Sequence, residues 1–79
     1  RIASFLIMLT ARAERLELPC APLEIPMSRN DIGDYLGLTT ETVSRTLTRL
    51  KQSGVIALNS DRRISIIDAE TLNEIAEGF

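Results

Sequence analysis

The sequence predicts a small, mainly α-helical domain with one β-hairpin, and three observations support this fold class. Apolar residues recur at three- and four-residue spacing in segments that begin near Ser, Thr or Asp, as they do in amphipathic helices. Two runs rich in β-branched residues flank a short polar segment near the C-terminus, which is typical of a hairpin. A chain of 79 residues with 44% apolar side chains has room for a single core.

The N-terminal segment predicts the first helix and a short strand. One helical face carries Ile2, Phe5, Leu6, Leu9 and Ala13. Pro19 is expected to stop this helix, because proline cannot continue the hydrogen-bond ladder. An edge strand is expected over residues 23–27, where Pro26 is tolerated only at the margin of a sheet.

Residues 28–54 predict two helices joined by a tight turn. Ser28 is the expected N-cap of the first helix, with Asp31 as its capping-box partner. The apolar face of this helix is expected to comprise Ile32, Tyr35 and Leu36.

Gly37 is expected to end the first of these helices, because glycine adopts a positive φ without strain. Thr39 is the expected N-cap of the second helix, and Gly54 lies at its end. The buried stripe of the second helix is expected to be Val43, Leu47 and Leu50.

Residues 55–67 predict a hairpin, or wing, whose tip carries Arg62 and Arg63. Asp68 is expected to cap a C-terminal helix over residues 68–78, with Leu72 and Ile75 facing inward and Phe79 as a further inward candidate. The order of elements is that of a winged helix-turn-helix. We therefore expect residues 1–79 to form a single domain of that fold.

Charge is unevenly distributed along the chain. The net charge is −2, but residues 28–63 hold six basic and four acidic residues, whereas residues 64–79 hold four acidic residues and no basic one. A mildly positive middle with an acidic tail predicts weak, salt-sensitive contact with nucleic acid.

Composition excludes several other classes of function. The chain has no His, one Cys and no clustered carboxylates, so we expect no enzyme activity, no metal site and no cofactor. Cys20 is expected to be a small loop residue between two prolines, with a redox-sensing thiol as the alternative. A cytoplasmic location fits a single cysteine, and the longest apolar run is too short to span a membrane.

The start of the second helix carries the residues that we expect to read DNA bases. A recognition helix meets base edges with its N-terminal part. Arg45 can donate twice to guanine, and Glu41 can accept from cytosine or orient Arg45. Ser44 lies beside both, and Thr40 is a further base-reading candidate. A solvated Glu41–Arg45 ion pair without any reading role is the alternative interpretation.

A second set of residues is expected to contact the DNA backbone. Ser28, Arg29 and Thr39 lie at helix starts, where backbone amides attract phosphate. The other backbone candidates are Thr42 and Arg49 on the second helix and Arg62 and Arg63 on the wing. From these positions we expect Arg45→Ala to abolish sequence preference, and Arg29→Ala to weaken binding to all sequences alike.

Residues 1–67 resemble the DNA-binding domain of the Crp/Fnr superfamily of bacterial transcription regulators. The resemblance is carried by RIA and FL at the start, by MSRNDIGDYLGL, by TETVSRTL and by LKQSGVI. Glu41, Ser44 and Arg45 match the Fnr and FixK branch, which implies a TTGAT-type half-site. Thr40 occupies a variable reading position.

The same resemblance implies further parts and partners. It implies an N-terminal sensor domain and a dimerisation helix, neither of which is present in this sequence, and a homodimer that binds a palindrome. The loop Glu17 to Glu24 would correspond to a region that touches RNA polymerase in relatives. The competing hypothesis is a winged helix that binds protein rather than DNA, and the negative net charge favours it.

Overall fold

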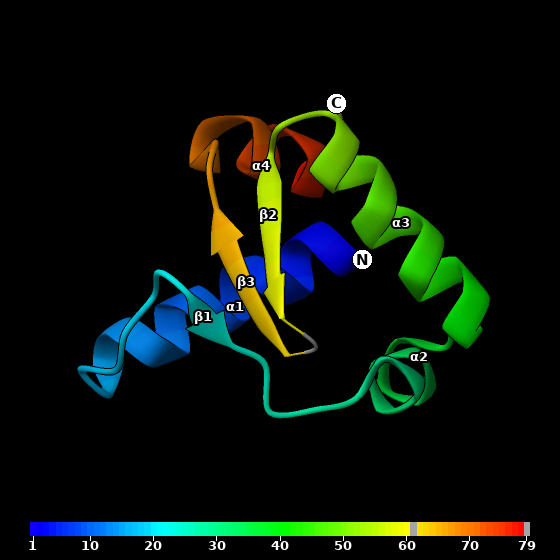
Figure 1. The fold of residues 1–79 in the computed structure, drawn as a ribbon, viewed down its shortest axis with the longest axis horizontal. Coiled ribbons are helices and arrows are strands. Elements are labelled where there is room, and N and C mark those ends of the chain that lie inside the picture. The colour runs from blue at the N-terminus through cyan, green and yellow to red at the C-terminus, as the bar shows by residue number, and fades with distance from the viewer. Residues whose placement is uncertain (61, 79) are drawn as a thin grey trace.

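The computed structural model describes residues 1–60 and 62–78, with Ser60 described by its backbone alone. The elements follow the predicted order (Figure 1). They are α1 (Ile2–Arg15), β1 (Leu23–Glu24), α2 (Arg29–Leu36), α3 (Thr40–Gln52), β2 (Ile56–Ser60), β3 (Arg63–Ile66) and α4 (Ala69–Ala76). The winged helix-turn-helix prediction is confirmed.

The sheet has three antiparallel strands in the order β1-β3-β2. The predicted hairpin pairs Ile56 with Ile66, and the edge strand joins it by pairing Leu23 with Ile64. The Ile25 amide still donates to the Arg62 carbonyl at 2.6 Å. Strand β1 is shorter than the strand predicted over residues 23–27, and Pro26 lies just beyond it.

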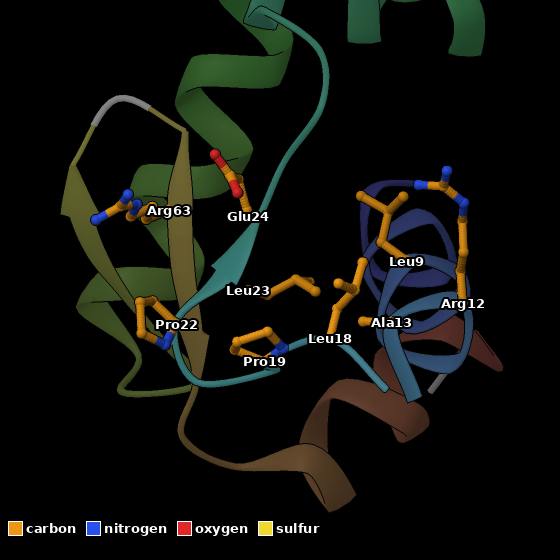
Figure 2. A pocket seen from close by; sticks show the side chains of 9 residues that line it. All are labelled: Leu9, Arg12, Ala13, Leu18, Pro19, Pro22, Leu23, Glu24 and Arg63. Atoms are coloured by element: carbon orange, nitrogen blue, oxygen red, sulfur yellow. The ribbon is translucent and has the colours of Figure 1, made fainter. Parts of the chain in front are cut away.

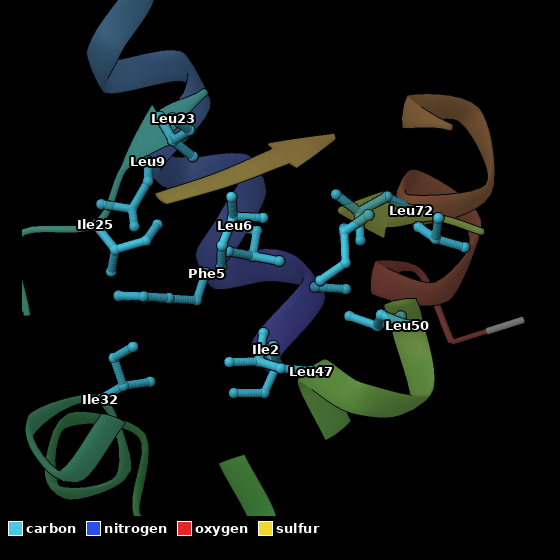
Figure 3. Packing of buried hydrophobic residues seen from close by; sticks show 14 of the residues in the cluster. Ile2, Phe5, Leu6, Leu9, Leu23, Ile25, Ile32, Leu47, Leu50 and Leu72 are labelled. Carbon is cyan, nitrogen blue, oxygen red and sulfur yellow. The ribbon is translucent and has the colours of Figure 1, made fainter. Parts of the chain in front are cut away.

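The core lies around α1, between the helix-turn-helix and the sheet. In Figure 3, side chains of α1 converge with side chains of α2, α3, β1 and α4. The buried members are Ile2, Ala3, Phe5, Leu6, Leu9, Ala13, Leu23, Ile25, Ile32, Val43, Leu47, Leu50, Val55, Ile56, Ile64 and Leu72. The predicted apolar faces of α1 and α3 are therefore confirmed.

Two inward-facing predictions are wrong. Tyr35 is 64% exposed, although its ring lies 5.9 Å from the Phe5 ring, so it covers the edge of the core rather than entering it. Ile75 is 39% exposed, because only the Leu72 side of α4 turns toward the core. Phe79 lies outside the described residues.

The end of α1 also differs from the prediction. The helix ends at Arg15, before Pro19, and Glu17 adopts a positive φ of 56°. The Leu18 amide then donates to the Ala13 carbonyl at 2.8 Å, so a backbone reversal closes the helix before the proline is reached. Among the described residues, no helix combines the length and apolar character needed to cross a bilayer.

Candidate nucleic-acid interface

Three local caps fix the geometry of the helix-turn-helix. The Ser28 hydroxyl accepts from the Asp31 amide at 3.1 Å, and the Thr39 hydroxyl accepts from the Thr42 amide at 3.1 Å. Between them, Gly37 has a φ of 73° and ends α2 in a left-handed conformation. These caps agree with the sequence prediction, because each depends only on neighbouring residues.

Gly33 allows the turn to pack directly against α2, and sequence reasoning missed it. Its carbonyl accepts from the Leu38 amide at 2.8 Å. A Cβ atom at residue 33 would lie 2.6 Å from the Leu38 carbonyl oxygen. A glycine inside a short helix was the only available signal, since glycine disfavours helix interiors.

Helix α3 presents two chemically different sides. Val43, Leu47 and Leu50 are buried, and Val43 has no exposed surface. The name α3 outer face is given to Thr40, Glu41, Ser44 and Arg45, four neighbouring residues of the first two turns that lie outside this buried stripe. Glu41 and Arg45 are exposed there, and the Ser44 side chain is half-buried. The structure thus brings all four predicted base-reading residues to one surface.

Two hydrogen bonds connect this face to the start of α2. Arg29 Nη1 donates to Ser44 Oγ at 3.3 Å. Thr40 Oγ1 donates to Asn30 Oδ1 at 2.8 Å. Sequence reasoning did not identify either contact, because the partners are separated by fifteen and ten residues.

The predicted backbone-contact residues on the helices lie around the same surface. Ser28 and Thr39 mark the N-termini of α2 and α3, and the Thr39 hydroxyl donates to Thr42 Oγ1 at 2.9 Å. Arg49 is exposed in the last turn of α3. These groups surround the α3 outer face with amides, hydroxyls and a guanidinium, which are the groups that bind phosphate.

The two wing arginines occupy different settings. Arg62 is exposed in the turn between β2 and β3. Arg63 is also exposed, but it begins β3 and lies opposite Glu24 of β1. Arg62 is therefore nearer the tip of the wing, whereas Arg63 is held in the sheet, paired through its backbone with β1.

A second surface feature lies where α1 meets β1. This α1–β1 groove has a volume of about 300 Å³ and is mostly apolar (Figure 2). Its lining residues are Leu9, Arg12, Ala13, Leu18, Pro19, Pro22, Leu23, Glu24 and Arg63. All of them lie outside α2 and α3, so the groove is separate from the α3 outer face.

Cys20 lies half-buried next to this groove. Its thiol is 3.9 Å from the Thr10 carbonyl oxygen and 3.8 Å from the Leu18 carbonyl oxygen, both within reach of a weak S–H hydrogen bond. Cys20 packs against the core as a small residue between two prolines, as the sequence suggested. Within the described residues, no cluster of three or more His, Cys, Asp or Glu side chains is arranged to hold a metal ion.

The cap of α4 contains an aspartate with a perturbed pKa. The Thr71 hydroxyl donates to one carboxylate oxygen of Asp68 at 2.7 Å, and the Thr71 amide donates to the other at 3.1 Å. Both bonds favour the ionised form and hold the pKa of Asp68 below its ordinary value.

Comparison with known proteins gives consistent matches. The family model described as a Crp-like helix-turn-helix domain matches residues 1–75. The chain is 48% identical over 75 residues to the nitrogen fixation regulation protein FixK of Rhizobium meliloti, covering 95% of this chain and 34% of that protein. It is 44% identical over 78 residues to the transcriptional activator protein FnrA of Stutzerimonas stutzeri, covering 99% and 32% respectively.

Solved structures agree with the sequence relatives. FixK2 from Bradyrhizobium japonicum superposes with a TM-score of 0.82 at 38% identity, covering 92% of this chain and 35% of that one. The CO-dependent transcription factor CooA from Carboxydothermus hydrogenoformans gives a TM-score of 0.72 at 26% identity, covering 94% and 35%. The chain spans about a third of the length of these relatives. By their names, FixK of Rhizobium meliloti, FnrA and CooA are regulators of nitrogen fixation or transcription.

Proposed function

Because this chain belongs to the Crp-like helix-turn-helix family, we propose that it binds double-stranded DNA sequence-specifically by placing the start of α3 in the major groove. The observation that carries this proposal is the division of α3 into a buried apolar side and the α3 outer face. Because α3 packs against the core of the domain through its apolar side, its polar residues form a rigid projecting surface. The major groove is wide enough to admit such a helix.

Base readout is assigned to the α3 outer face. Arg45 is exposed and can donate two hydrogen bonds to the O6 and N7 atoms of a guanine. Glu41 lies one turn earlier and can accept from the amino group of a cytosine. Ser44 and Thr40 complete the contact surface. The Glu41, Ser44 and Arg45 set matches the Fnr and FixK branch, so the proposed half-site is of the TTGAT type.

Contacts with the DNA backbone are assigned to the surrounding residues. Helix N-termini attract phosphate through free amides and the helix dipole, which supports roles for Ser28, Arg29 and Thr39. Thr42 and Arg49 are the further backbone residues on α3. On the wing, the proposed contacts are Arg62 and Arg63, with the flanking backbone or minor groove.

Two partners are proposed for the whole protein. Two copies would bind successive major-groove faces of a palindrome, with half-sites about 34–36 Å apart. RNA polymerase is proposed to meet the loop from Glu17 to Glu24, whose tip residues Leu18 and Pro19 are exposed. Relatives described as transcriptional activators support this second partner.

Fluorescence anisotropy with the 79-residue chain tests the proposal. Labelled duplexes containing a TTGAT half-site are compared with scrambled duplexes of the same composition, at two salt concentrations. We expect tighter binding to the TTGAT duplex, and weaker binding to both duplexes as salt rises, because phosphate contacts release counterions. Equal affinity for both duplexes would contradict sequence-specific binding.

The competing function is a module that binds protein. The α1–β1 groove, with its mostly apolar lining, is the observation that favours it. A chain that showed no salt-dependent DNA binding in the same experiment would support this alternative.

A further inference from the structure

The contact between Arg29 and Ser44 links a predicted phosphate-binding residue to a predicted base-reading residue. Arg29 is the first residue of α2, and Ser44 lies on the α3 outer face. Arg29 Nη1 and Ser44 Oγ are 3.3 Å apart, and both side chains are half-buried. Because a guanidinium can only donate hydrogen bonds, Ser44 Oγ must be the acceptor.

This direction distinguishes Ser44 from the hydroxyls of Thr10 and Ser53. Thr10 in α1 and Ser53 just after α3 donate to carbonyls four residues earlier, at 2.9 Å and 3.0 Å, so their hydroxyl hydrogens are used by the adjacent helical backbone. Ser44 instead receives a hydrogen bond from a neighbouring helix. Its own hydrogen can then point outward as a donor. In the major groove, the matching acceptors are purine N7, guanine O6 and thymine O4, but not the amino group of cytosine.

We infer that Arg29 is a positioning residue for base readout, which orients the Ser44 hydroxyl so that it donates to an acceptor atom on a base edge. This inference rests on the proposed function and deepens it. A guanidinium has five N–H donors, so Arg29 can hold Ser44 and still bind a phosphate. One side chain then links backbone positioning to sequence readout. The expectation from sequence alone was different: loss of Arg29 would weaken all DNA sequences alike.

The test measures affinity for a panel of duplexes in which each base pair of the half-site is replaced in turn. The variants are Ser44→Ala, Arg29→Met, which keeps a long stem without donors, and the double variant. Ser44→Ala should lose discrimination at one base pair of the half-site. Arg29→Met should reduce discrimination at that same base pair by about two- to tenfold, as expected for the loss of one net hydrogen bond. The double variant should lose nothing further at that pair, and Arg29→Lys should restore part of the preference.

Arg49→Met is the matched control, because Arg49 is exposed and its proposed contact is with the backbone alone. It should weaken every duplex by a similar factor. If Arg29→Met behaved like this control, or if its effect at that pair added fully to that of Ser44→Ala, the inference would be overturned and the proposed function would stand. A wild-type chain without any base preference would overturn both.

A measurement without DNA tests the contact itself and shows whether each variant folds. In amide NMR spectra of the free chain, Arg29→Met should shift the Ser44 resonance while the dispersed pattern of the fold is retained. Arg49→Met should leave Ser44 in place. A Ser44 resonance that was unmoved by Arg29→Met would overturn the positioning role.

Discussion

The α3 outer face and the α1–β1 groove are both open to solvent, yet they differ in polarity and in how their side chains are held in place. The α3 outer face is polar, and hydrogen bonds from Arg29 and to Asn30 hold two of its four side chains in place. The groove is mostly apolar, and its exposed Leu18 and Pro19 belong to the loop after α1. A polar surface with fixed side chains is suited to contact base edges and phosphates, whereas an apolar groove is suited to bind another protein.

This difference shows which sequence signals are informative about DNA binding. The net charge of the chain is −2, which by itself argues against a nucleic-acid partner. The helical spacing of Glu41, Ser44 and Arg45, which lie outside the buried stripe of α3, carries more information than the net charge. DNA recognition depends on local donors and acceptors as well as on overall electrostatics.

Replacing one leucine in each region should give the largest contrast. Leu47 is 3% exposed beneath the α3 outer face, and Leu18 is 53% exposed in the groove. Leu47→Ala should lower the free energy of unfolding by about 2–5 kcal/mol, because it leaves a cavity in the core. Leu18→Ala should change it by only about 0.5 kcal/mol. Urea denaturation measures both, and similar losses for the two variants would contradict the burial described here.

Replacing one arginine in each region tests function rather than stability. Arg45→Ala should reduce discrimination between TTGAT and scrambled duplexes by about 1–3 kcal/mol, because a bidentate guanine contact is lost. Arg12→Ala, in the groove, should leave discrimination unchanged. Anisotropy titrations of the two variants with both duplexes measure this discrimination. An Arg45→Ala chain with full preference would show that the α3 outer face does not read bases.

Gly33 provides a smaller test of how α2 supports α3. Gly33→Ala places a methyl group against the Leu38 carbonyl and should destabilise the fold by about 1–3 kcal/mol, less the gain of about 1 kcal/mol from alanine's helix propensity. Asp34→Ala, at the exposed neighbouring position, is the control. Thermal unfolding followed by circular dichroism measures both. A Gly33→Ala chain as stable as the control would mean that the turn can move away from α2.

The smallest expected effect concerns pH at α4, away from both surfaces. The folded state lowers the pKa of Asp68, so its stabilising contribution is present above the ordinary pKa of aspartate and is lost as the pH falls through the lowered one. Thr71→Val removes the hydroxyl donor and should raise the Asp68 pKa in an NMR titration. Thr71→Ser keeps the hydroxyl and should not. Equal pKa values in both variants would contradict the role of the hydroxyl.

Local chemistry made much of the fold predictable from sequence. Ser28, Gly37, Thr39 and Asp68 cap or end helices as expected, because each acts on residues within one turn. The Asp31 amide is held by Ser28, whereas the predicted return bond from the Asp31 side chain is not among the hydrogen bonds of the described residues. The buried stripe of α3 followed from helical spacing alone.

Features that depend on distant residues could not be predicted in the same way. The pairing of β1 with β3 joins segments about forty residues apart in sequence, and no local pattern specifies it. Tyr35 has the right spacing for the core but lies at its edge, because α1 already fills the space. The four base-reading candidates were brought together as expected, but the bonds from Arg29 to Ser44 and from Thr40 to Asn30 required the packed helices.

Amide NMR spectra of the chain titrated with a TTGAT duplex test the central claim most directly. We predict that the largest shifts occur over Thr40–Arg45 and at Ser28 and Arg29, while Leu18–Glu24 in the groove and its loop remain unchanged. Shifts concentrated in Leu18–Glu24, with residues of the α3 outer face unmoved, would contradict the account.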